Sequence, residues 1–177
     1  RRQVLGTTSI TTIEADTIVT TKSGTLTYFY EPKPDTIIKP EIIFPGLENV
    51  TYHINDAGFH QLHDYPKEKK EDVYRIITIG DSFTFGSKVN TADNYPSQLE
   101  HILNTKLVCS TIKKFEVLNL GVGGYDIQYA VKRLQLRGIQ YKPDLVMWLL
   151  IPDDFTRLDE LFIPRFKKHL TEAKKSD

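Results

Sequence analysis

Three strand-like runs separated by helix-like segments limit the fold more than any other feature of this sequence. The runs cover residues 73–79, 115–120 and 145–151, and the last of them is apolar at every position. A run that is apolar on both faces is typical of a strand buried inside a parallel sheet. Because short connections link the alternating segments, we predict right-handed crossovers and an α/β fold.

Two helix-like segments separate these strands. Residues 93–104 repeat apolar side chains at helical spacing, and Asp126 is placed to cap a second helix that Gly138 can end. Residues 155–173 also look helical. Three strands are few for an open sheet, so we expect the domain to continue beyond Asp177.

Residues 1–50 differ in amino-acid composition from the rest of the chain. Residues 7–29 are rich in Thr, Ile and aromatic side chains, and the turn-forming residues 22–24 divide them. β-Branched runs around a glycine turn predict a hairpin. Prolines between residues 32 and 45 then favour an extended connector. We therefore divide the chain into a β-rich N-terminal arm or small β layer at 1–50 and an α/β domain at 51–177.

The charge balance and the cysteine count exclude several classes of protein. Lys and Arg together number 23, as do Asp and Glu, so the chain lacks the cationic excess that non-specific nucleic-acid binding requires. Its single cysteine, Cys109, excludes an internal disulfide and a cysteine-rich zinc site. The longest apolar run, residues 145–151, is far shorter than the ~20 residues of a membrane span. The sequence begins with Arg rather than Met, so we expect that trimming has removed any export signal or membrane tether.

Three segments follow the strands, and open α/β sheets bind their ligands at the carboxyl ends of strands. They are residues 80–86, 119–125 and 151–155, and we expect them to meet at one edge of the sheet. Ser82 comes directly after the first strand, where its hydroxyl can stand above the sheet and the next N–H groups can face an anion. The alternative is that Ser82 only caps a helix. Thr84 stands where a Gly-x-Ser-x-Gly nucleophile elbow has its last glycine.

The glycine-rich run at 121–124 allows two interpretations. Gly-x-Gly after a strand resembles a dinucleotide-binding loop, but the third glycine of that motif would fall on Asp126, whose carboxylate would repel a pyrophosphate. The other interpretation is a backbone donor, because a glycine in a strand–helix turn offers an unobstructed N–H. Gly124 is well placed for that role, so we favour the donor and expect no cofactor.

Two of these segments carry a family resemblance. The sequence Gly-Asp-Ser-Phe-Thr-Phe-Gly at 80–86 resembles the first block of the SGNH (GDSL-type) hydrolases, and Asn-x-Gly-x-x-Gly at 119–124 resembles their second block. Asn-Asp-Ala-Gly-Phe at 55–59 and Asn-Tyr-Pro at 94–96 resemble flanking segments of a bacterial subgroup of the family. The resemblance covers residues 52–155.

The resemblance implies a flavodoxin-like three-layer α/β/α fold and a serine nucleophile. Ser82 would attack an ester carbonyl, and the N–H groups of Ser82 and Gly124 would stabilise the oxyanion. The third block of the family, Gly-x-Asn-Asp, falls on residues 151–154, where Ile151 replaces the glycine and Asp153 replaces the asparagine. An ionised Asp153 cannot donate a hydrogen bond, so either this carboxyl is protonated or two backbone donors suffice.

The general base of the family, supplied by an Asp-x-x-His block, has no counterpart here. None of the five histidines follows an aspartate at that spacing. The simplest interpretation is that this sequence stops before the catalytic histidine. The others are a family member that has lost hydrolysis, or a base recruited from His60 or His63. Those two histidines with Asp64 also form a weak metal-site pattern, but we favour an ordinary surface loop and predict no metal.

From the resemblance we expect a serine esterase or acyl-transfer enzyme that acts on an O-acetyl group or a lipid ester through a Ser82 acyl-enzyme. We expect this 177-residue chain to be weakly active or inactive. A catalytically inactive binding or assembly domain on the same fold is the alternative. The expected partners are an ester, an acylated glycan or a lipid, and not a nucleic acid. Relatives of this subgroup are often exported or membrane-anchored, so an extracytoplasmic location is expected from the resemblance alone.

Overall fold

A three-stranded parallel sheet forms the centre of the molecule. The computed structural model describes residues 10–21, 24–40 and 46–157. The strand order is β6–β5–β7, with β5 (Val73–Ile79) in the middle, β6 (Lys114–Asn119) on one side and β7 (Leu145–Trp148) on the other. Both pairings are parallel, which confirms the α/β fold predicted from the alternating segments.

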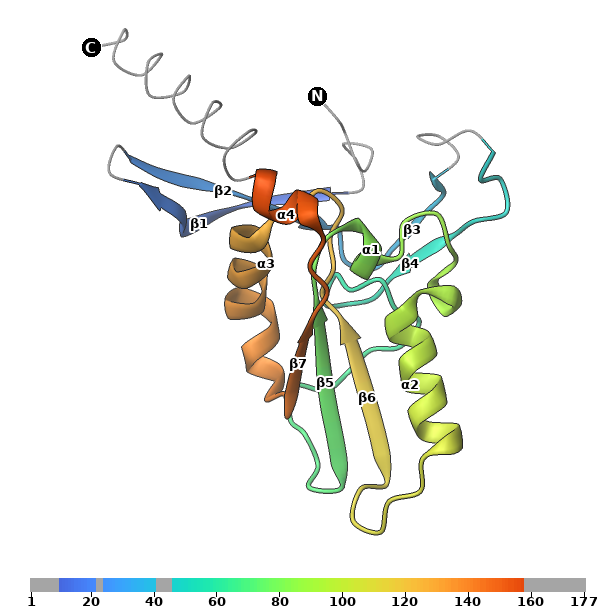
Figure 1. The fold of residues 1–177 in the computed structure, drawn as a ribbon. Helices are drawn as coiled ribbons and strands as arrows, with labels where there is room; N and C mark the ends of the chain where they lie inside the picture. The colour runs from blue at the N-terminus through green and yellow to red at the C-terminus, as the bar shows by residue number, and fades with distance from the viewer. Residues whose placement is uncertain (1–9, 22–23, 41–45, 158–177) are drawn as a thin grey trace, which may run out of the picture.

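Two helical segments connect these strands and flank the sheet, α2 on the β6 side and α3 on the β7 side (Figure 1). Helix α2 (Tyr95–Lys106) follows a short 3-10 turn (Thr91–Asp93). Helix α3 (Ile127–Arg133) continues through a π-helical turn (Leu134–Gly138) into a 3-10 turn (Ile139–Tyr141).

The predicted end of this helical segment at Gly138 is wrong. The backbone stays helical to Tyr141, and Lys142, with φ of 52°, adopts the left-handed conformation that ends it. Gly138 has a different reason to be glycine, because a Cβ there would lie 2.9 Å from Leu120 and 3.2 Å from Ile77 of the sheet. The residue allows the helix to approach the sheet closely.

The core lies between the sheet and the chain that precedes it. Its buried members come from β5, from β6 and the residue after it, and from the segments at 59–65 and 141: Phe59, Tyr65, Ile77, Ile79, Leu118, Leu120 and Tyr141. A buried ion pair joins β5 to β6, where Nη2 of Arg75 lies 2.6 Å from Oε2 of Glu116. Arg75 also donates to the carbonyl of Tyr141, so its charge is neutralised and its donors are used inside the fold.

The N-terminal region is β-structured, as its Thr- and Ile-rich sequence predicts. Strands β1 (Ile10–Thr21) and β2 (Gly24–Pro32) form an antiparallel hairpin, and β3 (Thr36–Ile38) pairs antiparallel with β4 (Tyr52–Ile54). The division of the chain at residue 50 stays a prediction. The β3–β4 pair joins residues from both sides of that position.

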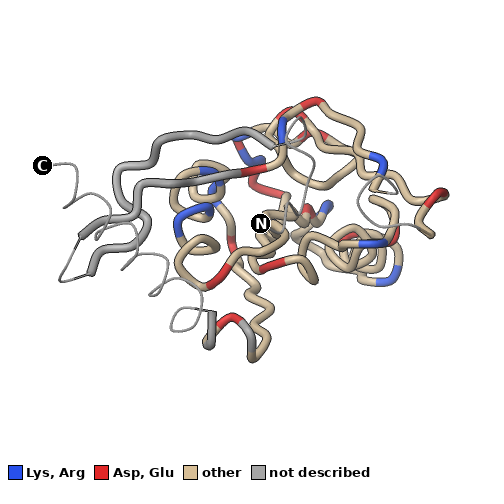
Figure 2. Tube along the Cα trace, turned by 90° about the horizontal axis from the view of Figure 1, so that it is seen from above, with Lys and Arg blue, Asp and Glu red and all other residues tan. Residues whose placement is uncertain are grey.

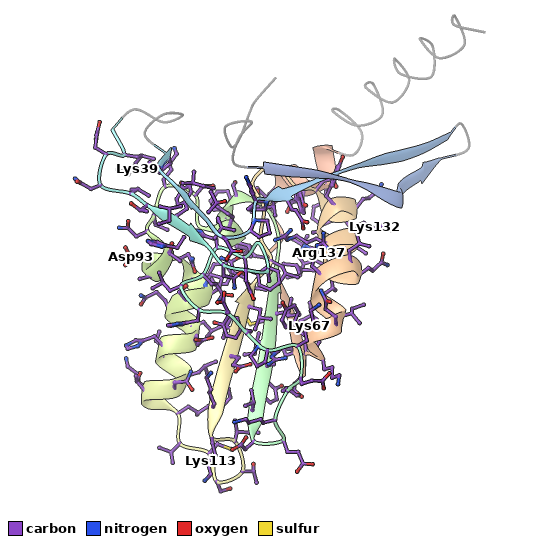
Figure 3. The ribbon with its side chains drawn as sticks, turned by 180° about the vertical axis from the view of Figure 1, so that it is seen from behind. Lys39, Lys67, Asp93, Lys113, Lys132 and Arg137 are labelled. Atoms are coloured by element: carbon purple, nitrogen blue, oxygen red, sulfur yellow. The ribbon has the colours of Figure 1, made fainter. Side chains whose placement is uncertain are left out.

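An ion-pair cluster ties the end of the hairpin to α3. Arg133 donates through Nη1 to Oε2 of Glu31 at 2.7 Å, and Arg137 donates through Nη2 to Oε1 at 2.6 Å. Both Arg133 and Glu31 are buried. The hairpin therefore projects past α3 from a fixed base, as seen from the front in Figure 1 and from behind in Figure 3, where Arg137 is labelled.

A short helix, α4 (Pro152–Arg157), follows β7. It begins three residues before the helix predicted at 155–173, and the rest of that predicted helix lies outside the described residues. Among the residues that the structure describes, no helix has the length and apolar character needed to cross a membrane.

Candidate active site

The three segments singled out by the sequence lie together at the carboxyl edge of the sheet. Helix α1 (Ser82–Phe85) follows β5, the glycine run follows β6, and α4 follows β7 (Figure 1). Backbone hydrogen bonds join the three exits: Val122 N–H donates to the carbonyl of Gly80 at 3.2 Å, and Leu149 N–H donates to that of Ile79 at 3.2 Å. The expected meeting of the three segments is confirmed.

Ser82 is the first residue of α1, and its side chain is partly buried. The helix is capped by Asp81, whose carboxylate accepts from Phe83 N–H at 2.9 Å. The alternative that Ser82 merely caps a helix is therefore wrong. Its hydroxyl lies 3.5 Å from the Asp81 carboxylate, the upper limit of a hydrogen bond, so this contact holds Oγ only weakly.

Gly80 makes the tight turn from β5 into α1. Its φ is 152°, and a Cβ on this residue would lie 2.3 Å from Oγ1 of Thr84 and 2.9 Å from the carbonyl oxygen of Leu149. Any side chain would push α1 away from the strand end. Glycine at position 80 therefore allows Ser82 to sit directly above the sheet.

The glycine run packs directly on the backbone of α1. A Cβ on Gly121 would lie 2.3 Å from the nitrogen of Phe85 and 2.6 Å from the carbonyl carbon of Thr84. Gly124, the predicted second oxyanion donor, has φ of 86° and is partly buried. The structure thus brings the segment that carries Gly124 into contact with the helix that carries Ser82.

Two aspartates hold the turns around the site. Asp126 caps α3, as predicted, by accepting from the N–H groups of Gln128 at 3.0 Å and Tyr129 at 3.1 Å. Burial raises the pKa of Asp126, and the nearby charge of Asp154 raises it further. Asp154 is buried and accepts from Ile151 N–H at 3.0 Å, so it organises the turn into α4.

Asp153, which replaces the family's asparagine, lies in the first turn of α4. Its side chain lies outside the part of the structure that is described. The oxyanion role of Asp153 therefore stays a prediction.

His60 does not act as a base. Its side chain is fully buried, Nδ1 lies 2.7 Å from the carbonyl oxygen of Phe85, and Nε2 lies 2.9 Å from Oγ1 of Thr91. Burial lowers the pKa of His60 to about 4. Because both ring nitrogens already have partners inside the protein, His60 neither takes the proton of Ser82 nor binds a metal. His63 is exposed.

The part that Asn119 plays was not predicted from the sequence. This fully buried side chain belongs to the last residue of β6, and its amide nitrogen donates to the carbonyl of Phe85 at 3.2 Å. Its amide oxygen accepts from Gly121 N–H at 3.0 Å. Asn119 thus connects α1 to the glycine run. The Asn-x-Gly-x-x-Gly motif singled out this residue, but it gave no sign that its side chain contacts Phe85.

A shallow groove of about 420 Å³ lies elsewhere, between the 61–63 segment and α2. Its lining includes His63 and His101 but neither Ser82 nor Gly124. We place the candidate site at the sheet edge rather than in this groove, because Ser82 and Gly124 both lie at that edge. Viewed from above, basic and acidic residues are mixed along the described trace rather than separated by sign (Figure 2).

Comparison of the chain with models of known families finds no match. A search of curated proteins likewise finds none at a significant level. The motifs at 80–86 and 119–124 and their shared position at the sheet edge therefore carry the functional argument.

Proposed function

We propose that this chain carries the nucleophile and oxyanion donors of an SGNH-type serine esterase or acyl-transfer enzyme on a flavodoxin-like three-layer fold. The observation that carries the proposal is the packing of Gly121 on the backbone of α1, which brings the glycine run against the serine turn. The strand order β6–β5–β7 with helical crossovers supports the fold assignment.

In the proposed reaction, Oγ of Ser82 attacks the carbonyl carbon of an O-acetyl or lipid ester and loses its proton to a base. The negative charge on the carbonyl oxygen is stabilised by the N–H groups of Ser82 and Gly124, each of which contributes about 3 kcal/mol in sites of this kind. The alcohol then leaves with a proton, and an acyl-enzyme remains. Water or a second alcohol attacks that ester and regenerates Ser82.

The described part of this chain shows no general base for Ser82. No histidine follows an aspartate at the family spacing, and both ring nitrogens of His60 already have hydrogen-bond partners. Slow turnover by this chain is therefore part of the proposal. The alternative, a catalytically inactive binding or assembly domain, is favoured by the same missing motif and by Asp153 in place of asparagine.

Fluorophosphonate labelling separates the two functions. With imidazole added in place of the missing base, we expect a slow covalent adduct on Ser82, located by mass spectrometry of peptides, and no adduct in Ser82→Ala. Absence of an adduct from folded wild-type protein would contradict the enzyme and support the binding domain.

Chemical rescue tests the missing base. We expect wild-type protein to hydrolyse p-nitrophenyl acetate slowly, and added imidazole to raise this rate beyond its effect on Ser82→Ala. The variant matters because imidazole itself cleaves the ester. If wild-type turnover is fast without imidazole and depends on Ser82, this chain already contains its base and that part of the proposal fails.

A further inference from the structure

The carbonyl oxygen of Phe85 receives two side-chain donors from different parts of the chain. Nδ1 of His60 lies 2.7 Å away and Nδ2 of Asn119 lies 3.2 Å away. Phe85 is the last residue of α1, where helix carbonyls have no partner within the helix. Both donors belong to fully buried side chains, so the contact is shielded from water.

The chemistry of these partners determines the state of the His60 ring. A carbonyl oxygen only accepts, so Nδ1 carries the hydrogen, and in a neutral ring Nε2 accepts from the hydroxyl of Thr91. The ring stacks on Phe85 with centroids 4.5 Å apart and meets the edge of Tyr52 at 4.8 Å. The two hydrogen bonds and the two aromatic contacts together fix the orientation of the His60 ring.

Asn119 completes the arrangement from the other side. Its amide nitrogen donates to Phe85, while its amide oxygen accepts from Gly121 N–H at 3.0 Å. The same side chain therefore holds the end of α1 and the start of the glycine run. A helix of one turn has little stability of its own, so these external contacts decide where α1 lies.

We propose that His60 is a positioning residue of the Ser82 site. Together with Asn119 it clamps the Phe85 carbonyl, and this clamp fixes α1, with Ser82 at its start, against the run that carries Gly124. The catalytic consequence rests on the proposed function, whereas the clamp itself does not.

Amide hydrogen exchange tests the clamp without reference to activity. The reporters are the N–H groups of Phe85, Gly86 and Ser87, of which the last two donate to the carbonyl of Ser82. In His60→Phe, which keeps a ring but loses both hydrogen bonds, we expect their exchange to accelerate about tenfold beyond any change at core amides of β5 and β6.

Conservative variants provide the decisive comparison. In His60→Asn the amide nitrogen stands near the former Nδ1, so we expect this variant to restore most of the protection. In His60→Gln the side-chain amide stands near the former Nε2, so the hydrogen bond to the Phe85 carbonyl is not restored. The reporter amides should therefore exchange as fast as in His60→Phe. Equal exchange in His60→Asn and His60→Gln, or acceleration no greater than that of the core, would overturn the proposal.

Asp144→Ala serves as the matched control. It removes another side-chain contact to backbone, the 2.7 Å bond from Arg75 N–H, together with the ion pair to Lys69, in the loop that precedes β7 at the opposite end of the sheet. We expect Asp144→Ala to lower protection from hydrogen exchange throughout the protein. The three reporter amides should not exchange faster than the core amides do. A selective change there would show that any destabilisation opens α1, which contradicts a specific clamp.

Labelling of Ser82 with a fluorophosphonate adds the chemical readout. We expect its rate to fall in His60→Phe and to recover in His60→Asn. If the reporters respond as described while no variant, wild type included, is labelled, the clamp stands and the proposed function fails. If labelling is normal in His60→Phe, the positioning role fails and the proposed function stands.

Discussion

His60 shows how burial sets the state of a single side chain. Its ring lies between two aromatic rings and has no contact with water, and this burial lowers its pKa to about 4. The ring of His53 adds a smaller effect in the same direction. A histidine that would titrate near 6.5 when unfolded therefore stays neutral in the folded protein down to about pH 4.

This difference predicts a loss of stability on acidification. Between pH 6.5 and about 4 the unfolded chain binds a proton at His60 that the folded protein does not bind, so the free energy of unfolding falls with pH. The full effect is on the order of 3 kcal/mol. Urea unfolding at pH 7 and pH 4.5 measures it, with His60→Asn as the control that should show a smaller decline. The raised pKa of Asp126 acts with the opposite sign and is common to both proteins.

Gly121 allows a second prediction at this scale. A methyl group at position 121 would collide with the backbone of α1, which has no flexible end to move aside. We expect Gly121→Ala to lower the free energy of unfolding by about 1–3 kcal/mol and to slow labelling of Ser82. Gly46→Ala is the control, because a Cβ at Gly46 meets nothing within 4 Å. Its cost comes from the positive φ alone, so labelling should not change.

At the scale of elements, the base of the hairpin depends on one carboxylate. Glu31 lies at the end of β2 and forms ion pairs with Arg133, which is fully buried, and with Arg137, which is one-third exposed. Arg133 also donates to the carbonyl of Gly58 and lies over the ring of Phe59. The hairpin, α3 and the segment before His60 are thus joined at one point.

Removing this carboxylate should therefore be costly. We expect Glu31→Gln to lower the free energy of unfolding by about 3–5 kcal/mol, because it leaves a buried guanidinium without a counter-ion. Arg137→Gln should cost much less, since that side chain reaches solvent. Denaturant unfolding measures both. Glu68→Gln, which breaks the exposed pair with Lys142, should change nothing measurable, and a comparable loss there would contradict the argument from burial.

At the scale of the whole molecule, the sheet is unequally covered. Strand β7 pairs with β5 on one side, and within the described part of the chain nothing pairs with its other edge. Val146 and Met147 of this strand are 39% and 37% exposed, and the following Leu149 and Leu150 are 40% and 41% exposed. Exposed apolar edge strands tend to pair with other chains.

We therefore predict that this chain self-associates as its concentration rises. Val146→Lys should reduce the association, because a charge on an edge strand opposes pairing with a second copy. Sedimentation velocity across a range of concentrations measures it. The same mass at every concentration, for wild type and variant alike, would show that the β7 edge does not drive assembly.

Several elements of this fold are encoded by local sequence and could be predicted from it. The strand runs, the hairpin and the Asp126 cap each depend on residues within a few positions of one another, and all are observed. The run at 145–151, predicted as a strand buried on both faces, is instead the half-exposed edge strand β7 (Leu145–Trp148), because in the described part of the chain no further strand pairs with it. The other errors arose where a residue had a distant partner. Gly138 was interpreted as a helix end because its contact with Leu120 could not be seen, and His60 as a candidate base because Phe85 and Thr91 follow it by 25 and 31 residues.

By itself the sequence determined that this protein is built around parallel strands and that Ser82 follows one of them, because side-chain periodicity and turn residues act through neighbouring backbone. Only the tertiary structure decided which atoms hold that serine in place. The clamp on Phe85 and the Glu31 cluster join residues up to 106 positions apart. Such contacts depend on packing, burial and charge in the folded chain, which neighbouring residues do not encode.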